Sequence, residues 1–363
     1  MAHALALAER GRYTASPNPR VGCVLVRDGQ LVGEGFHARA GGPHAEVRAL
    51  EQAGEQARGA TAYVTLEPCS HVGRTPACAP QLVEAGVARV VTAMNDPNPL
   101  VAGRGHKLLR EAGVEVTEAI APAAARALNP GFVSRMERGR PWVTVKVAQS
   151  LDGRSALASG ESQWITGEAA RRDVQFLRAR QCAVLSGIDT VLTDSARLNV
   201  RLSADELGIE GEVRQPVRVV LDSGLRLPPF AAIFDAPGPV WLYTRDAADG
   251  VHHEALVKRE ATLIEAPAAP GLGMDLEFIL ADLAASEINE VLVEAGAKLA
   301  GAFVAADLCD ELVVYQAPVL LGHQARPALA LPEPGALAEV ARWEITDETR
   351  IGDDLRLTLR PAR

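Results

Sequence analysis

Short runs of hydrophobic residues alternate along the first 120 residues with stretches of helical spacing. Strands are predicted at Val21–Val26, Leu31–His37, Ala62–Leu66, Val87–Met94 and Val114–Thr117. Asp28-Gly29, between the first two runs, is a strong hairpin signal. Helical spacing predicts helices over residues 1–11, from Pro43 through Ala53, and over Ala77–Ala85 and Gly105–Ala112. This alternation predicts a layered α/β domain.

A segment rich in Pro, Gly and Arg, Asn129–Pro141, interrupts the pattern. We place a domain boundary there and expect one domain over residues 1–140 and a second over residues 141–363. Strands are then predicted at Trp142–Ala148, Ala183–Ser186, Val217–Asp222, Val240–Thr244, Thr262–Glu265, Glu290–Glu294 and Glu311–Ala317. Helices are predicted at Gly167–Arg180, Leu276–Ala285 and Ala297–Ala306.

Composition places the chain among globular proteins. Of its 363 residues, 48% are hydrophobic and 23% are charged, which excludes a disordered chain. No uncharged apolar stretch reaches the roughly 18 residues that a membrane span needs. No basic segment leads an apolar run at the N-terminus, so we expect no signal peptide and a cytoplasmic protein. The net charge of −9 is +2 over residues 1–139 and −11 beyond, which argues against nucleic acid as a partner.

The sharpest chemical signal is a set of metal-ligand residues in the first half. His44 and Glu46 stand in Pro-His-Ala-Glu, and Cys69 in Glu-Pro-Cys is followed by Cys78. One imidazole and two thiolates make three zinc ligands, which leaves the fourth position to water in a catalytic site. Zinc lowers the pKa of bound water to about 7. Glu46 would then carry the proton from this water to the ring nitrogen and the departing ammonia.

The spacing of these residues separates them from related zinc sites. We expect His44 in the first helical turn after Pro43, and Cys69 at the opening of a helical stretch that favours a thiolate. The His-x-Glu and Pro-Cys parts match zinc deaminases, but C-x₈-C replaces C-x₂-C. A structural zinc site or buried thiols are the alternatives. The other three cysteines lie in apolar runs and are expected in the core: Cys23, Cys182 and Cys309.

Five motifs of the first half belong together: Ser16-Pro-Asn-Pro-Arg-Val-Gly22, Gly42-Pro-His-Ala-Glu46, Thr65-Leu-Glu-Pro-Cys-Ser-His71, Gly73-Arg-Thr-Pro-Ala-Cys78 and Asp96-Pro-Asn-Pro99. Together they resemble one family, the bifunctional deaminase/reductase of riboflavin biosynthesis. The similarity runs from about Ala8 past Leu320. It implies a cytidine-deaminase-like α/β/α domain that deaminates 2,5-diamino-6-(5-phosphoribosylamino)-4(3H)-pyrimidinone. The resemblance also implies that the pocket is lined by Asn18, His71, Arg74, Asp96 and Asn98.

The residue patterns of the second half of the chain indicate less about its function than those of the first half. Glu290–Gly296 reads as a strand and a turn before a helix, whose free N–H groups suit a diphosphate, but the pattern is not G-x-G-x-x-G. From spacing alone, nucleotide binding and an ordinary strand–helix turn both stay open. Four segments resemble the reductase half of the same family: Lys146–Arg154, Ser159–Thr166, Arg171–Arg178 and Val291–Ala302.

The resemblance implies a dihydrofolate-reductase-like α/β fold that uses NADPH to reduce the ribosyl group of 5-amino-6-(5-phosphoribosylamino)uracil to the ribityl product. NADPH contacts are implied for Ala148, Trp164, Thr190, Asp194, Ser223, Gly296, Ala297, Lys298, Leu299, Ala300, Gly301 and Ala302. Substrate contacts are implied for Lys146, Ser162, Arg178, Leu198, Arg201 and Glu294. Ser195 and Ala196 stand where the family usually has a polar residue and proline, shortly before Leu198 and Arg201.

Other functions remain open at this point. One is a deaminase whose second domain is degenerate or regulatory. Another is a stand-alone base or tRNA deaminase with an appended module. The C-x₈-C spacing and the weak positive charge of residues 1–139 argue against it. A third is a zinc-stabilised binding protein without turnover, which chelation should unfold. The resemblance also implies a homodimer or homotetramer that acts on small phosphoribosylaminopyrimidines, with no membrane partner.

Overall fold

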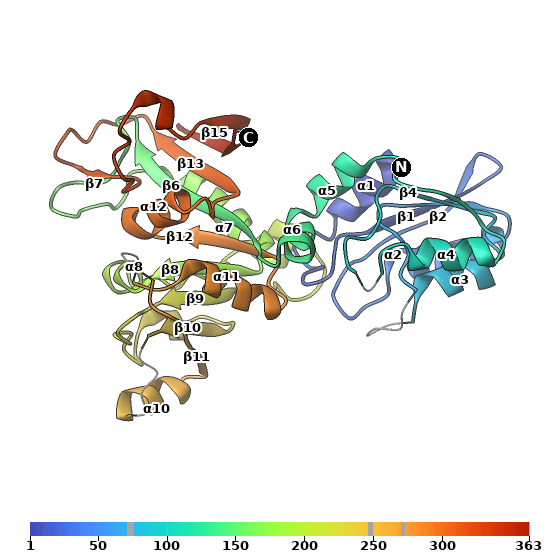
Figure 1. The fold of residues 1–363 in the computed structure, drawn as a ribbon, viewed down its shortest axis with the longest axis horizontal. Helices are drawn as coiled ribbons and strands as arrows, with labels where there is room; N and C mark the ends of the chain where they lie inside the picture. The colour runs from blue at the N-terminus through green and yellow to red at the C-terminus, as the bar shows by residue number, and fades with distance from the viewer. Residues whose placement is uncertain (71–75, 100, 246–249, 270–272, 363) are drawn as a thin grey trace. The chain divides into compact units, whose positions relative to one another are not determined.

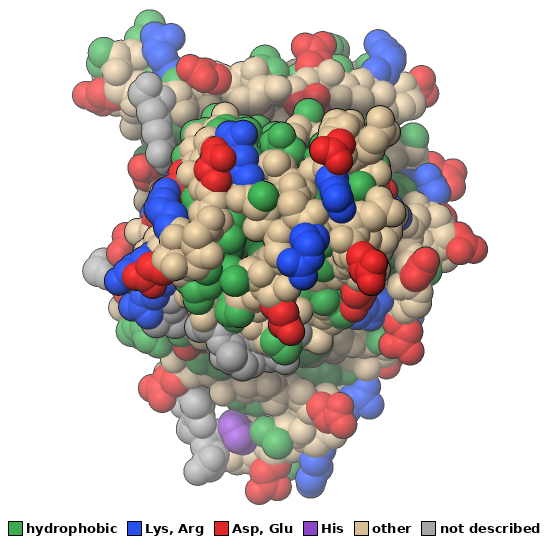
Figure 2. All heavy atoms as spheres, turned by 90° about the vertical axis from the view of Figure 1, so that its right-hand side faces the viewer, with side chains coloured by type: hydrophobic (Ala, Val, Ile, Leu, Met, Phe, Trp, Pro, Cys, Tyr) green, Lys and Arg blue, Asp and Glu red, His purple; other side chains and the backbone are tan. Residues whose placement is uncertain are grey.

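The computed structural model describes residues 1–363 except 71–75, 100, 246–249, 270–272 and 363. The chain divides into two compact units, Met1–Arg140 and Pro141–Arg363. No helix in the described ranges is long and apolar enough to cross a membrane. Acidic and basic side chains are interspersed on the face that Figure 2 displays, so neither sign of charge dominates it.

The first unit is an α/β/α sandwich around a sheet of order β2-β1-β3-β4-β5. The strands are β1 (Gly22–Arg27), β2 (Gln30–Phe36), β3 (Thr61–Val64), β4 (Arg89–Thr92) and β5 (Glu115–Thr117). The helices are α1 (Ala2–Glu9), α2 (Ala45–Ala53), α3 (Cys78–Glu84), α4 (Arg104–Glu111), α5 (Pro122–Leu128) and α6 (Pro130–Arg138), with the 3₁₀ turn η1 (Gly54–Ala57). The predicted hairpin forms, because β1 and β2 pair antiparallel across Asp28-Gly29.

Helices cover both faces of this sheet (Figure 1). On β1, Cys23 and Leu25 pack toward the core shared with α2, α3 and α4, whereas Val24 packs toward α1. This split follows from the period of two along a strand. Glycines let the layers approach closely: a Cβ on Gly22 would lie 2.0 Å from the carbonyl oxygen of Ala4 in α1, and one on Gly33 2.2 Å from that of Ala49 in α2.

The second unit is built on a sheet of order β11-β10-β9-β8-β12-β6-β13-β16-β15. Its strands are β6 (Trp142–Ser150), β8 (Ala183–Gly187), β9 (Val217–Leu221), β10 (Val240–Thr244), β11 (Ala261–Glu265), β12 (Glu290–Glu294), β13 (Glu311–Ala317), β15 (Trp343–Ile351) and β16 (Asp354–Pro361). A separate ribbon pairs β7 (Arg154–Ala156) with β14 (Arg326–Pro327). Strands from β11 to β13 run parallel, and β16 and β15 add an antiparallel edge.

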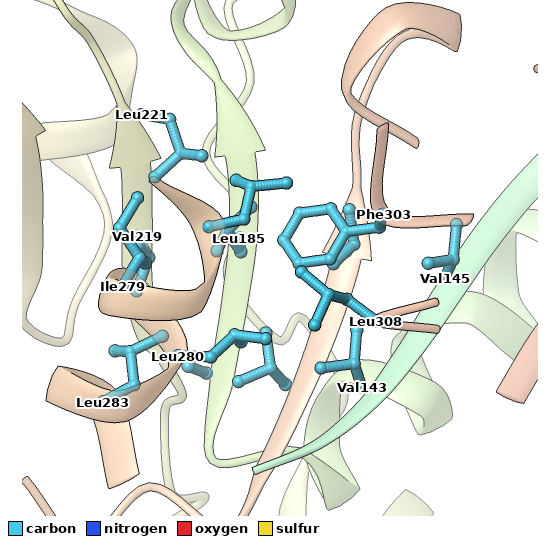
Figure 3. Packing of buried hydrophobic residues seen from close by; sticks show 14 of the residues in the cluster. Val143, Val145, Leu185, Val219, Leu221, Ile279, Leu280, Leu283, Phe303 and Leu308 are labelled. Atoms are coloured by element: carbon cyan, nitrogen blue, oxygen red, sulfur yellow. The ribbon is translucent and has the colours of Figure 1, made fainter. Parts of the chain in front are cut away.

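Helices bury both faces of the parallel part. The helices of this unit are α7 (Glu168–Arg180), α8 (Ile188–Asp194), α9 (Ala204–Leu207), α10 (Val251–Val257), α11 (Leu276–Ala285) and α12 (Ala297–Ala305), and its 3₁₀ turns are η2 (Ala232–Asp235) and η3 (Leu337–Glu339). Leu280 of α11 and Phe303 of α12 pack on Val143, Val145 and Leu185 of the strands (Figure 3). Because both faces are covered, the strands read as nearly continuous apolar runs.

Two local features differ from expectation. Pro130 begins helix α6 inside the segment taken as a boundary, because proline fits the first helical position and Gly139 ends the helix in the left-handed conformation. Cys69 does not open a helix; it lies in an irregular segment after β3, and α3 begins at Cys78. The expectation that Cys23, Cys182 and Cys309 are core residues is confirmed, since all three are buried.

Candidate functional site

Three metal-ligand side chains come from three places in the first unit. His44 is the residue immediately before α2, rather than within its first turn. Cys78 is the first residue of α3, and Cys69 lies between β3 and α3. The backbone N–H of Cys78 donates a hydrogen bond to the Cys69 sulfur at 3.3 Å, which ties the two cysteines together.

The donor atoms of these residues converge. His44 Nδ1 lies 3.1 Å from Cys78 Sγ and 3.7 Å from Cys69 Sγ, and all three donors lie within 4.8 Å of one another. Donors that share one tetrahedral zinc ion at about 2.0–2.3 Å lie roughly 3.5 Å apart. The set therefore fits a single ion, and its one imidazole and two sulfurs are the ligands that zinc prefers.

The electrostatics of the two sulfurs agree with this reading. A hydrogen bond from the Cys78 thiol lowers the pKa of Cys69 to about 4, with a further contribution from the His44 ring. The same bond, together with burial, raises the pKa of Cys78. Two sulfurs this close cannot easily ionise together, and a bound dication removes that obstacle because a coordinating thiol deprotonates.

Glu46 lies beside the sulfurs in the first turn of α2. Its side chain is buried, and burial, reinforced by the charge of Cys69, raises its pKa to about 7. It also makes a hydrogen bond with the Cys78 side chain. A carboxyl group with a pKa near neutrality can both accept and return a proton, which is the property required of a general base.

A buried histidine that the sequence reasoning missed links Asn18 to this cluster. The Asn18 amide nitrogen lies 3.0 Å from His37 Nε2, and His37 Nδ1 lies 3.2 Å from the carbonyl oxygen of Pro43. The His37 ring packs edge-on against that of His44, with 5.3 Å between centroids. Burial lowers the pKa of His37, although the hydrogen bond to the Pro43 carbonyl oxygen partly offsets this shift. Its position after a strand gave no sequence signal.

Asp96 and Asn98 lie together in the loop after β4. The backbone N–H of Asn98 donates to Asp96 Oδ1 at 2.8 Å, and Asp96 is buried. Burial raises the pKa of Asp96 to about 7. The predicted pocket residues His71 and Arg74 lie outside the described residues.

In the second unit, a charge cluster contains four of the predicted substrate residues, of which three are partly buried and the fourth, Arg201, is exposed. Arg178 of α7 binds Glu294 of β12 through two hydrogen bonds, Nε to Oε1 at 2.5 Å and Nη2 to Oε2 at 3.0 Å. Lys146 of β6 is the register neighbour of Glu294. Arg201 lies within electrostatic reach of both Arg178 and Glu294. Three cations around one carboxylate leave this cluster positive.

The environment tunes each charge in that cluster. Burial lowers the pKa of Lys146, and Glu294 opposes the shift. For Glu294, the neighbouring Arg178 and Lys146 outweigh the cost of burial, so its pKa is lowered. Leu198 is buried close by, since the carbonyl oxygen of the following Asn199 accepts a hydrogen bond from Arg178 Nη1 at 3.0 Å. A positive, partly dry cluster suits a phosphorylated ligand.

Most of the predicted NADPH residues gather at the carboxyl ends of neighbouring parallel strands. Thr190 is in the helix after β8, Ser223 follows β9, and Gly296 follows β12. The Gly296 N–H donates to Thr190 Oγ1 at 3.1 Å. Ala148 lies near the carboxyl end of β6. Ligands of open parallel sheets bind at this edge.

The α12 start at this edge fits a diphosphate. No side chain caps α12, and its first turn, which includes Ala297, Lys298 and Leu299, contains no acidic residue. Its backbone N–H groups therefore face the edge as donors for an anion. Further along, Ala300 and Gly301 are buried, and a Cβ on Gly301 would meet the Ala330 carbonyl oxygen at 2.3 Å. Gly301 thus serves packing, and the half-buried Ala302 packs on the same core.

For the remaining predicted residues, no contact among the described residues joins them to the Glu294 charge cluster or to the start of α12. Trp164 is 68% exposed, and the Arg171 guanidinium lies 4.6 Å from its ring centroid. Ser162 precedes it in the same loop and is half-buried. Asp194 ends α8 and is exposed, although partial burial of its carboxyl group raises its pKa.

These two domains define a class: a zinc-type deaminase domain joined to a parallel-sheet reductase domain. Residues 1–94 match the family described as the cytidine and deoxycytidylate deaminase zinc-binding region, and residues 141–357 match the RibD C-terminal domain. The riboflavin biosynthesis protein RibD of Escherichia coli (strain K12) is 50% identical, over 99% of this chain and 98% of its own length. That of Haemophilus influenzae is 47% identical, over 99% and 96%.

Solved structures agree over the whole chain. Acinetobacter baumannii RibD (form 1) has a TM-score of 0.91 at 47% identity, covering 100% of this chain and 98% of that one. A Thermotoga maritima diaminohydroxyphosphoribosylaminopyrimidine deaminase/5-amino-6-(5-phosphoribosylamino)uracil reductase has a TM-score of 0.85 at 32% identity, covering 100% and 97%. The chain belongs to the RibD family of riboflavin biosynthesis proteins. It is a bifunctional deaminase and reductase, to which zinc and NADPH fit as cofactors.

Proposed function

We propose that residues 1–140 deaminate 2,5-diamino-6-(5-phosphoribosylamino)-4(3H)-pyrimidinone, and that residues 141–363 then use NADPH to reduce the ribosyl group of 5-amino-6-(5-phosphoribosylamino)uracil. The observation that carries the first activity is the convergence of His44, Cys69 and Cys78 beside the buried Glu46. The positive cluster around Glu294 supports the second. The chemistry named for the Thermotoga maritima relative is the same pair of reactions.

In the deaminase domain, His44, Cys69 and Cys78 would hold zinc. When bound, zinc supplies a Lewis acid that activates water at neutral pH. Glu46, with its pKa near 7, accepts one proton of the attacking water and gives it to the ring nitrogen. It then carries the second proton, from the new hydroxyl group, to the amine, which departs as ammonia. Asn18, Asp96 and Asn98, together with His71 and Arg74, would orient the pyrimidine and its phosphate.

In the reductase domain, the nicotinamide of NADPH supplies the hydride to C1′ of the opened ribosyl group, and the protein binds and orients both molecules. Lys146, Arg178 and Arg201 would attract the phosphate, while Glu294 holds Arg178 in place. Ser162 and Leu198 would complete this substrate site. Ala148, Thr190, Ser223 and the start of α12 would receive the cofactor. The exposed Trp164 and Asp194 would also contact it.

A substitution of Glu46 tests the deaminase assignment. Glu46→Ala should abolish ammonia release from the diamino pyrimidine, because no other carboxylate is assigned to move the proton. Zinc content, and NADPH oxidation on supplied deaminated substrate, should stay at wild-type levels. Glu51→Ala, at an exposed position of the same helix, is the matched control and should deaminate normally. Normal deamination by Glu46→Ala would show the assignment to be wrong.

Two further measurements separate the proposal from its alternatives. NADPH consumption on the deaminated substrate distinguishes an active reductase domain from a degenerate or regulatory one. Zinc chelation should remove deamination while the circular dichroism of the fold is kept, whereas a zinc-stabilised binding protein would unfold. For the chain as a whole, we propose a homodimer or homotetramer in the cytoplasm without a nucleic-acid partner. Sedimentation equilibrium and cell fractionation test the assembly and the location.

A further inference from the structure

Glu67 makes a buried hydrogen-bonding hub next to the metal-ligand segment. It stands two residues before Cys69, and its side chain is fully buried. Its carboxyl oxygens accept backbone N–H groups from residues 29 to 39 positions further along the chain. No role follows for this residue from the zinc chemistry, because Glu67 is not one of the three converging donors.

The hub holds both ends of the loop that contains Asp96. Oε2 accepts from Asp96 N at 3.3 Å and from Gly103 N at 2.9 Å. Oε1 accepts from Gly105 N at 3.0 Å and from His106 N at 3.5 Å. The last three donors belong to the start of α4, whose preceding residue offers no side-chain cap. A carboxylate at a helix start satisfies these N–H groups and is favoured by the helix dipole.

Close packing and local hydrogen bonds join the described residues of this loop to one another and to the segment before Cys69. A Cβ on Gly105 would lie 1.9 Å from the Pro68 carbonyl oxygen and 3.3 Å from Glu67 Oε1, so α4 contacts the backbone directly before Cys69. Within the loop, Asn98 N donates to Asp96 Oδ1, and the Asn98 carbonyl accepts from Val101 N at 2.8 Å. Moving the Glu67 carboxylate would therefore shift Asp96 and Asn98 together.

We propose that Glu67 is a positioning residue for deamination: it fixes the Asp96–Asn98 wall of the pyrimidine pocket relative to the metal ligand Cys69. This inference rests on the proposed function, since it takes Asp96 and Asn98 as substrate contacts and Cys69 as a ligand. Glu67 acts through the loop backbone and does not touch the substrate. Its loss should therefore weaken substrate binding more than it slows the proton transfers at Glu46.

Glu67→Gln provides the mildest test. The amide keeps the shape of the side chain but turns one acceptor into a donor that faces backbone N–H groups. We expect KM for the diamino pyrimidine to rise roughly tenfold or more, because a hydrogen bond to a charged group is lost. We expect kcat to change less than about threefold, zinc to stay stoichiometric, and NADPH oxidation on deaminated substrate to be unchanged. Amide hydrogen exchange at Gly103 and Gly105 should accelerate.

Two variants complete the design. Asp152→Asn is the matched control, because Asp152 is also a carboxylate that accepts two backbone N–H groups, those of Leu321 and Gly322 in the second unit. It should leave deaminase KM unchanged. Glu67→Asp keeps both acceptor oxygens, so it should fold even if Glu67→Gln does not. Its KM for the diamino pyrimidine should lie between that of the wild type and that expected for Glu67→Gln.

The inference is overturned by a wild-type KM and wild-type amide exchange in Glu67→Gln. It is also overturned where zinc content and kcat fall in proportion while KM of the zinc-loaded fraction stays normal, since Glu67 would then serve the metal segment alone. The failure of the proposed function is distinguishable: the wild-type protein would not deaminate the pyrimidine at all. Exchange at Gly103 and Gly105 would still report on the Glu67 contacts.

Discussion

Replacing Glu294 by glutamine should destabilise the reductase unit strongly. The side chains of Arg178 and Glu294 are only 13% and 10% exposed, and they are joined by two hydrogen bonds. Lys146 is the register neighbour of Glu294 on β6. Glutamine keeps the shape of the side chain but removes the one negative charge between these two cations. Glu294→Gln therefore leaves two buried like charges uncompensated.

Removing one partner from a buried ion pair costs about 3–5 kcal/mol of unfolding free energy. Glutamine still offers one acceptor oxygen to Arg178, so we expect the lower end of this range, about 3 kcal/mol. For a domain of this size, each kcal/mol shifts the unfolding midpoint by about 2–4 °C. The midpoint should therefore fall by roughly 6–12 °C.

Tryptophan fluorescence during urea unfolding is the assay, because all four tryptophans lie in residues 141–363: Trp142, Trp164, Trp241 and Trp343. Glu344→Gln, at an exposed position of β15, is the control and should change the free energy by less than about 0.5 kcal/mol. The double variant Arg178→Met/Glu294→Leu should cost less than Glu294→Gln, because it leaves no unpaired member of the pair. A cost below about 1 kcal/mol for Glu294→Gln would refute the reasoning.

Three further predictions concern stability. Phe303→Ala should cost about 3–5 kcal/mol in the same urea assay, because Phe303 is fully buried, whereas Phe230→Ala, at a residue 85% exposed, should cost less than about 0.5 kcal/mol. Burial raises the pKa of Asp96 to about 7, above an unfolded value of about 3.9. Its contribution to the free energy of unfolding is therefore present below about pH 4, and it is lost as the pH rises from there through 7. Relative to Asp96→Asn, calorimetry of the wild-type zinc-loaded protein should show up to roughly 4 kcal/mol lost between pH 4 and 8, and parallel pH curves would contradict this. Gly22→Ala should destabilise the first unit by about 1–3 kcal/mol in calorimetry, because its Cβ would lie 2.0 Å from the Ala4 carbonyl oxygen, and an unchanged midpoint would show that α1 can move without cost.

Local patterns predicted much of the secondary structure. The Asp28-Gly29 turn and the strand Glu290–Glu294 before a helix at Ala297 are signals carried by adjacent residues, and the structure contains both. The C-terminal strands β15 and β16 were missed. Most residues of β15 are exposed, so its sequence lacks the apolar run by which the other strands were found. It becomes a strand because β16 pairs with both β15 and β13.

The residues of the candidate site also fall into two groups: those that short motifs reveal and those that only contacts between distant segments reveal. His44, Glu46, Cys69 and Cys78 stand in short motifs whose residue types already specify zinc-deaminase chemistry, so they could be named without coordinates. His37 and Glu67 could not, because a single histidine after a strand, or a glutamate before Pro-Cys, has no distinctive spacing. Their significance lies in contacts with residues far along the chain, such as Asn18 and Gly105.

By itself, the sequence determined the layered α/β class, the order of the two domains and the candidate metal-ligand side chains, since strand periodicity, turn residues and ligand chemistry are encoded over a few neighbouring positions. Only the tertiary structure decided which groups share an environment. Burial beside Cys69 brings the pKa of Glu46 to about 7, and the register of β12 on β6 sets Glu294 next to Lys146. Such effects depend on distance and desolvation between segments remote in sequence, and these quantities exist only once the chain is packed.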